Sequence, residues 1–286
     1  MQDPYISVIV PLYNKEDSIE STINSVLNQS YNNCELIIVN DGSSDRSVEI
    51  VRGINDNRIV LIEQNNGGPS KARNTGVTNS HGSWILFLDA DDELMPGALE
   101  HFAKLVQTHQ SISMFCCEFS VKKGTLSYDR YRYNNTIVNN AYKSWFYDEC
   151  CPRTGATIYS RELVMQCPFM NGIRRFEDLE CLFRMFRFSK MYLSHFNALT
   201  LNVDYASAST PRQDIKEDFL GHLDFSNKSF WEFMCLYQLY LGERDNYTHE
   251  IDSLYPHLRY RYDLLLLYKL LHFYNIIKKN VFQRKH

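Results

Sequence analysis

Acidic side chains follow two of the apolar runs in the first third of this 286-residue chain. Asp41 comes shortly after the run 36–39, and Asp89 and Asp91 follow the run 84–88. Carboxylate oxygens suit Mg²⁺ or Mn²⁺, and such an ion can hold a diphosphate group. The chain contains neither GxGxxG nor GxxxxGK[ST], so we do not expect a dinucleotide or P-loop site. These residues predict a carboxylate-rich pocket in which Mn²⁺ or Mg²⁺ binds a diphosphate.

Four short apolar runs predict strands that are buried on both faces, as in a parallel sheet. They are residues 6–10, 36–39, 58–62 and 84–88. Apolar residues at helical spacing predict helices at 16–29, after the N-cap sequence 43–45, at 70–80 and at 96–108. This alternation of strand and helix predicts a doubly wound α/β sheet.

Ligands bind beyond the carboxyl ends of the strands in such a sheet. The polar side chains at those ends are therefore candidate site residues. Tyr13 and Asn14 follow the first strand, and Ser43 lies beside Asp41 after the second. We expect Asn14 and Ser43 to be further candidates for ligand contacts.

Asp89 and Asp91 are separated by one residue. At an extended strand end, side chains alternate, so both carboxylates would point to the same side. The alternative is that they are solvated acids before the helix that Pro96 begins. Their position directly after a buried strand favours the functional interpretation.

The regular alternation weakens after residue 120. Residues 121–155 are rich in Tyr and Asn and predict a loop-rich insertion. The pattern then predicts a helix at 178–188 and a strand at 191–205, and it is helical from 213 to the end.

The bulk composition excludes several classes of protein. The net charge of -4 lacks the basic excess typical of nucleic-acid-binding proteins, so we expect no nucleic-acid partner. The eight Cys include no CxxC pair, and we interpret them as reduced thiols of a cytosolic protein. The N-terminus shows no signal-peptide pattern, and the apolar stretch 264–277 is too short and interrupted to span a membrane.

Four motifs follow one another along the first third of the chain. They are Val8-Ile9-Val10-Pro11-Leu12-Tyr13-Asn14, Ile38-Val39-Asn40-Asp41-Gly42-Ser43-Ser44-Asp45, Asn66-Gly67-Gly68-Pro69-Ser70-Lys71-Ala72-Arg73-Asn74 and Phe87-Leu88-Asp89-Ala90-Asp91-Asp92. In order and spacing, residues 5–110 resemble family 2 glycosyltransferases of the GT-A fold. The resemblance weakens through 111–170, returns at Phe176-Glu177-Asp178 and Leu182-Phe183-Arg184, and is absent from about 213.

This resemblance implies an α/β fold of the GT-A type, a Rossmann-like and mostly parallel sheet flanked by helices. We expect the catalytic domain over 1–210, with a nucleotide-binding half at 1–110 and an acceptor half at 111–210. Residues 211–286 would form a helical C-terminal extension.

The resemblance also implies roles on the donor side. Pro11, Tyr13 and Asp41 would line the nucleobase pocket, where Asp41 would accept a hydrogen bond from a base N–H group, usually of uracil. Arg73 would lie beside the nucleotide and the acidic motif.

The acidic residues carry the catalytic roles that the resemblance implies. Asp91 would ligate the divalent ion, Asp89 would contact the ribose or the metal, and Asp178 matches the catalytic base. Glu177 is the alternative base, and both acids also suit the start of the helix at 178–188. Residues 203–209 resemble the late segment that folds over the donor, and we leave its metal role open.

The implied activity is an inverting transfer of a sugar from a nucleotide diphosphate donor, expected to be a UDP-sugar. The acceptor would be a hydroxyl on a saccharide or lipid-linked molecule, in the synthesis of cell-surface polysaccharide or glycoconjugate. One alternative is a nucleotidyltransferase, which would want a Gly-rich loop with Arg and Lys after the first strand. The other is a non-catalytic sugar-binding module, which would have lost Asp91 or Asp178.

The C-terminal residues 259–286 contain seven Lys or Arg and one Asp. On a helix, Lys269, His272, Asn275 and Lys279 share one face, and apolar residues cover much of the rest. Such a helix is typical of peripheral contact with an anionic membrane, here the cytoplasmic face. A helix packed on the catalytic domain, with a solvated basic face, is the other interpretation.

Overall fold

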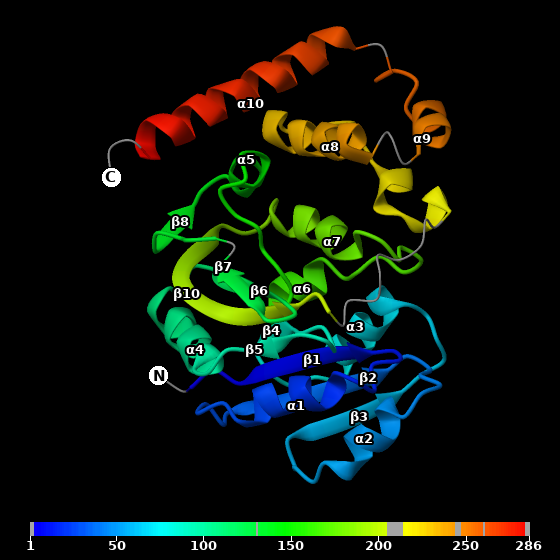
Figure 1. The fold of residues 1–286 in the computed structure, drawn as a ribbon, viewed down its shortest axis with the longest axis vertical. Helices are drawn as coiled ribbons and strands as arrows, with labels where there is room; N and C mark the ends of the chain where they lie inside the picture. The colour runs from blue at the N-terminus through cyan, green and yellow to red at the C-terminus, as the bar shows by residue number, and fades with distance from the viewer. Residues whose placement is uncertain (1–2, 130, 205–213, 244–246, 260, 284–286) are drawn as a thin grey trace.

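The computed structural model describes residues 3–129, 131–204, 214–243, 247–259 and 261–283 (Figure 1). Within these residues a ten-stranded sheet runs through the molecule in the order β3-β2-β1-β4-β9-β6-β10-β5. Strand β7 pairs with β6, and β8 pairs with β10. The predicted α/β sheet flanked by helices is confirmed.

The first half of the sheet is parallel and agrees with the predicted order of strands and helices. Its strands are β1 (Ile6–Leu12), β2 (Cys34–Asn40), β3 (Ile59–Glu63) and β4 (Trp84–Phe87). Its helices are α1 (Ile19–Leu27), α2 (Ser47–Gly53) and α3 (Pro69–Thr78). Every residue of β2 is buried, which explains its unbroken apolar run.

Side chains of these strands alternate between two cores. Ile9 of β1 belongs to the core that also contains Ala72 of α3. Its neighbours Val8 and Val10 belong to the other core, together with Ile23 of α1. The sheet is thus covered on both faces, and its carboxyl edge stays open for a ligand.

The second half of the sheet is mixed. Its strands are β5 (Glu93–Leu94), β6 (Met114–Lys123), β7 (Leu126–Asp129), β8 (Thr136–Val138), β9 (Thr157–Ser160) and β10 (Met191–Asn202). Its helices are α4 (Ala98–Thr108), α5 (Ala141–Phe146), α6 (Arg161–Gln166) and α7 (Glu177–Met185). Strands β6 and β10 pair in parallel, whereas β9 is antiparallel to both β4 and β6.

Three local expectations were wrong. The stretch 121–155, expected to be loop-rich, contains β7, β8 and α5. Strand β7 forms a hairpin with the adjacent β6, whereas β8 pairs with the distant β10. Strand β4 ends at Phe87, so Asp89 and Asp91 lie on the following loop and turn rather than on an extended strand. Helix α2 begins at Ser47, after a turn in which Asp45 accepts hydrogen bonds from the Ser47 N–H and hydroxyl.

The C-terminal part is helical, as predicted. It comprises the short 3₁₀ helices η1 (Ile215–Glu217) and η2 (Phe219–His222), followed by α8 (Phe230–Glu243), α9 (Thr248–Leu254) and α10 (Tyr262–Gln283). Leu236 of α8 and Ile251 of α9 belong to the same core as α7. Arg175, which precedes α7, forms ion pairs with Asp218 before η2 and with Glu243 at the end of α8.

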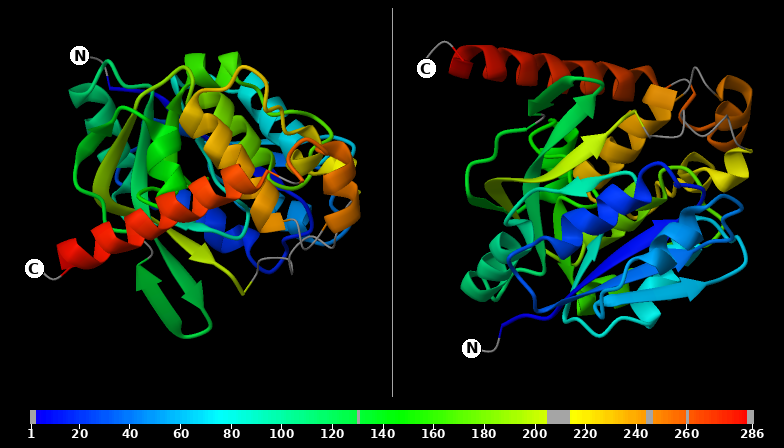
Figure 2. Two further views of the ribbon diagram at one scale, coloured as in Figure 1. Left: turned by 90° about the horizontal axis from the view of Figure 1, so that it is seen from above. Right: turned by 60° about the horizontal axis from the view of Figure 1, so that its bottom comes forward.

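Helix α10 lies on the side of the molecule away from β1–β3 (Figure 2). Its polar residues His272 and Asn275 face inward, where His272 packs on Phe146 and Asn275 donates a hydrogen bond to the Tyr147 carbonyl. Apolar Leu266, Leu270 and Phe273 face outward and are exposed. In the described part of the chain, no helix has the length and apolar character needed to cross a bilayer.

Candidate active site

The carboxyl ends of β1, β2 and β4 border a cavity of about 430 Å³, which we call the donor cavity. Most of the predicted site residues lie in its wall. They are Pro11, Tyr13, Asp41, Arg73, Asp89, Asp91 and Glu177. The loops of three parallel strands therefore converge on one space, as expected for an open α/β sheet.

Arg73 connects the acidic motif to the start of α7. It is buried, and its guanidinium donates to Asp89 Oδ1 at 2.8 Å and to Glu177 Oε1 at 2.9 Å. Burial lowers the pKa of Arg73, but the two carboxylates outweigh it and raise the pKa overall. The planar guanidinium presents a separate N–H group to each partner in a fixed geometry.

Both oxygens of Asp89 already have partners. Oδ1 accepts from Arg73, and Oδ2 accepts from the Thr154 hydroxyl at 2.9 Å. Burial raises the pKa of Asp89, but Arg73 and Thr154 outweigh it and lower the pKa overall, which keeps the carboxylate ionised. Thr154 has no motif in the sequence, and only its contact with Asp89 reveals it.

Asp91 pairs with a lysine that sequence reasoning missed. Lys15 Nζ lies 2.6 Å from Asp91 Oδ2, and both residues line the donor cavity. Burial raises the pKa of Asp91, with Lys15 opposing the rise. The sequence could have indicated Lys15 only as the polar residue that follows Asn14 in the loop after β1.

Asp41 organises the loop that follows β3. Its carboxylate accepts hydrogen bonds from Gln64 Nε2 at 2.7 Å and from the N–H groups of Gly67 and Gly68 at 2.9 and 2.8 Å. The side chain is only 3% exposed. Gly68 has a φ of 85°, a conformation that L-residues rarely adopt. Asp41 thus shapes the donor cavity in addition to lining it.

Asn14 and Ser43 join the loops after β1 and β2. Asn14 Oδ1 accepts from the Ser44 N–H at 2.8 Å, and Ser43 Oγ accepts from the Asn14 N–H at 3.1 Å. Neither residue is among those that line the donor cavity. Tyr13 lies at the rim with its side chain 51% exposed, available to a ligand.

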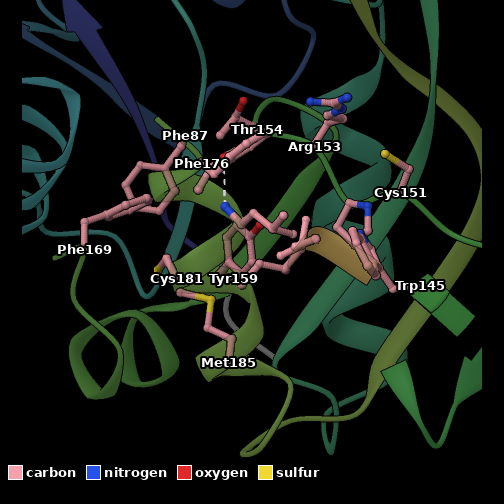
Figure 3. A pocket seen from close by; sticks show the side chains of 15 residues that line it. Phe87, Trp145, Cys151, Arg153, Thr154, Tyr159, Phe169, Phe176, Cys181 and Met185 are labelled. Atoms are coloured by element: carbon pink, nitrogen blue, oxygen red, sulfur yellow. Dashed lines mark hydrogen bonds between the residues drawn. The ribbon is translucent and has the colours of Figure 1, made fainter. Parts of the chain in front are cut away.

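Asp178 borders a second cavity of about 220 Å³, which we call the α7 cavity. Figure 3 shows aromatic rings of Trp145, Tyr159 and Phe169 around it, with Arg153 and Thr154 at one edge. Within α7, Asp178 Oδ1 accepts a hydrogen bond from the Leu179 N–H at 2.8 Å.

Two consecutive acids therefore face different spaces. Glu177 lies in the donor cavity, whereas Asp178 lies in the α7 cavity, and Phe176 lines both. Phe176 has a φ of 59°, which a bulky residue rarely adopts, and such strained backbone tends to cluster at active sites and ligand clamps. Burial raises the pKa of Glu177, and the charge of Arg73 opposes the rise.

The carboxylates of Asp89 and Asp91 fit a divalent ion whose remaining ligands come from a bound substrate and water. No cluster of three or more His, Cys, Asp or Glu side chains suitable for a metal occurs among the described residues. Mg²⁺ sites in phosphate-binding enzymes commonly use one or two carboxylates, with substrate oxygens and water as the other ligands. Asp91 has the more available carboxylate, because Arg73 and Thr154 already bind Asp89.

The segment 203–209 can be placed only in part. Val203 donates its N–H to the Lys122 carbonyl, and Asp204 accepts from the Gly124 N–H. Residues 205–209 lie outside the described residues, so the predicted cover over the donor is not tested.

Comparison with known proteins gives several relatives of the first half. GlyA of Streptococcus pneumoniae, a glycosyltransferase, is 41% identical over 111 residues, covering 38% of this chain and 16% of GlyA. An uncharacterized glycosyltransferase of Haemophilus influenzae is 42% identical over 125 residues, covering 41% of this chain and 50% of that protein. The matches thus span half or less of these two relatives.

Solved structures give a likeness over more of the chain. S. aureus TarS 1-349 in complex with UDP-GlcNAc has a TM-score of 0.68 at 20% identity, covering 84% of this chain and 72% of that one. The longer TarS structure has a TM-score of 0.66 at 21% identity, covering 96% of this chain and 53% of that one. At this identity the likeness shows the fold, which is that of the GT-A glycosyltransferases.

The family comparison includes both the motif loops and the start of α7. The family model described as Glycosyl transferase family 2 matches residues 7–179, which is more than half of the chain. The predicted fold and the predicted family are thus confirmed, and the chain belongs to glycosyl transferase family 2.

Proposed function

We propose that this chain transfers a sugar from a UDP-sugar to an acceptor hydroxyl with inversion at the anomeric carbon. The observation that carries the proposal is the pair of adjoining cavities, one lined by Asp41 and Asp91 and the other by Asp178. A donor and an acceptor can then approach one reacting centre from two sides. The TarS structures with UDP-GlcNAc and UDP support a uridine donor for this fold.

In this proposal the donor cavity holds the nucleotide. Pro11 and Tyr13 offer apolar contact to the base at the rim, and Asp41 accepts a hydrogen bond from a base N–H group. Asp91, with Asp89 beside it, would hold Mn²⁺ or Mg²⁺ on the diphosphate. When bound, the ion supplies charge stabilisation for the leaving nucleoside diphosphate.

Asp178 is the proposed general base. It lies in the α7 cavity, so it is placed to take the proton of an acceptor hydroxyl bound there. Glu177 is less suited because its Oε1 accepts from Arg73 at 2.9 Å. Proton removal on the side away from the leaving group gives in-line displacement, which inverts the anomeric centre.

The acceptor is proposed to be a saccharide or a lipid-linked saccharide at the cytoplasmic face of the membrane. The exposed residues Leu266, Leu270 and Phe273 of α10 support a peripheral contact, because they offer an apolar strip to the interface. Lys269 is exposed between them and would meet anionic headgroups. Synthesis of polysaccharide or glycoconjugate is the proposed setting.

Calorimetry with UDP, GDP and dTDP in Mn²⁺, followed by a screen of the matching sugars for nucleotide release, tests the donor. We expect UDP to bind at least about tenfold more tightly than GDP. Asp91→Ala should abolish metal-dependent turnover, with a loss of about 10³-fold or more. Asp17→Ala, which changes an exposed acid in the loop after β1, is the control. Equal binding of the three nucleotides, or full turnover by Asp91→Ala, would contradict the proposal.

A further inference from the structure

Lys15 places an ammonium group on the carboxylate that we assign to the divalent ion. Its Nζ atom lies 2.6 Å from Asp91 Oδ2, and the two side chains are only 18% and 15% exposed. The backbone of Lys15 is held in place because its N–H donates to Ser47 Oγ at 2.8 Å. The ion pair between Lys15 and Asp91 therefore joins the loop after β1 to the turn after β4.

An ammonium and a divalent cation on the same carboxylate lie only a few ångströms apart, even when they contact its two different oxygens. Two positive charges a few ångströms apart repel strongly where water is partly excluded. We propose that Lys15 is a displaceable counter-ion of Asp91, which a divalent ion must replace to bind. This inference rests on the proposed metal role of Asp91.

The nucleotide diphosphate gives the displaced lysine a new partner. Lys15 and Asp91 line the same cavity, so the released ammonium stays beside the space that the diphosphate occupies. Lysine suits this exchange because its charge is carried on a flexible four-carbon stem and binds phosphate as a point charge. A free divalent ion brings no phosphate group with which the displaced ammonium can pair.

Metal and nucleotide binding are then coupled through one side chain. The divalent ion and the nucleotide diphosphate both favour the displaced state of Lys15. Each therefore raises the affinity of the site for the other, and the two affinities rise by the same factor. The site would take up Mn²⁺ or Mg²⁺ mainly together with a nucleotide diphosphate and only weakly alone. Lys15 thus acts as a positioning residue that links occupation of the metal site to the presence of the donor.

Titration of the full chain with Mn²⁺, followed by the electron paramagnetic resonance of free Mn²⁺, tests this coupling without any turnover. The wild-type protein should bind Mn²⁺ weakly alone and more tightly with UDP. Lys15→Met should bind Mn²⁺ alone about tenfold more tightly or better, because a neighbouring like charge is gone. Its enhancement by UDP should shrink, because the diphosphate loses the ammonium.

Two further variants separate this contact from general effects of charge. Lys15→Arg keeps a cation and should keep the weak affinity of the wild type for Mn²⁺ alone. Lys71→Met removes a lysine that folds over Gly67, and it should change Mn²⁺ affinity much less than Lys15→Met. Unchanged affinity in Lys15→Met, or equal tightening in Lys71→Met, would overturn the inference.

Asp91→Ala distinguishes failure of the inference from failure of the proposed function. In the presence of UDP this variant should lose Mn²⁺ binding. If it binds Mn²⁺ as the wild type does, the metal site itself is misplaced and both proposals fall. If Asp91→Ala loses Mn²⁺ but Lys15→Met behaves as wild type, only the role of Lys15 is wrong.

Discussion

The two halves of the sheet present their site residues in different ways. In the parallel half, Asp41 and Asp91 lie in loops that directly follow β2 and β4, inside recognisable motifs. In the mixed half, Thr154 and Phe176 lie in irregular segments before β9 and α7. The first half therefore builds a donor cavity from strand ends, whereas the second builds the α7 cavity from packing between distant segments. This difference agrees with the proposed roles, in which one half binds the nucleotide and the other half binds the acceptor.

Arg73 is the physical link between the halves. It belongs to α3 in the first half, and it holds Asp89 on one side and Glu177 of α7 on the other. Breaking a buried ion pair by removing one partner costs about 3–5 kcal/mol, so this link is expensive to lose. Asp89 and Glu177 both line the donor cavity, so Arg73 joins the first half to α7 within that cavity.

The largest separation of the two halves is expected from Asp178→Asn. Transfer should fall roughly 10²–10⁴-fold, the usual contribution of a positioned base. UDP affinity should stay at the wild-type value, because Asp178 faces the α7 cavity. Steady-state rates on an acceptor and calorimetry with UDP are the measurements.

Glu177→Gln is the matched comparison for that change. It should mainly lower the melting temperature, because it weakens the contact with Arg73. If Asp178→Asn transfers sugar at a near-normal rate and Glu177→Gln loses transfer, the general base is Glu177 in the donor cavity. The proposed division of roles between the two cavities would then be wrong.

A smaller effect is expected from Asp41→Ala, confined to the nucleotide half. UDP affinity should fall about tenfold, equivalent to 1.4 kcal/mol. The free energy of unfolding should also fall by about 1–3 kcal/mol, because the N–H groups of Gly67 and Gly68 lose their acceptor.

Asn140→Ala supplies the control for Asp41→Ala. It removes the side-chain cap of α5, which typically costs about 1 kcal/mol of stability, and it should leave UDP affinity unchanged. If Asp41→Ala binds UDP with wild-type affinity, Asp41 has only a structural role. The proposed recognition of the base by the parallel half would then be wrong.

The smallest effect on catalysis is expected from the outer face of α10. The double change Leu270→Glu and Phe273→Glu should reduce co-sedimentation with phosphatidylglycerol vesicles at least about tenfold. Activity on a soluble acceptor and the melting temperature should stay at their wild-type values, because both side chains are exposed.

Leu126→Glu, on β7, replaces an equally exposed apolar residue and should leave vesicle binding intact. Equal loss in both variants, or no binding of the wild type to anionic vesicles, would refute the membrane contact. Deletion of 259–286 is a poorer test, because α10 packs on Phe146 through Tyr268 and His272.

Local pattern in the sequence was enough for the parallel half. Unbroken apolar runs identified β1 to β4. In β1, β2 and β4 the runs match strands buried on both faces, whereas β3 is an edge strand that is only half-buried, so the burial expected for it was wrong. The loops after those strands then had to meet at one edge, which brought Asp41, Asp89 and Asp91 to one cavity. The acidic start of α7 was also visible, but not that Glu177 and Asp178 would face separate spaces.

Only the tertiary structure decided which of these residues touch. Lys15 meets Asp91 across 76 positions, Arg73 meets Glu177 across 104, and Thr154 meets Asp89 across 65. Hydrophobic periodicity predicts local secondary structure, but it does not predict contacts between side chains that lie far apart in the chain. They depend on how the mixed half of the sheet folds against the parallel half, where pairing and burial outweigh local preference. The sequence by itself therefore determined the family and the donor edge, and the packing of the two halves determined the counter-ion of Asp91 and the place of Asp178.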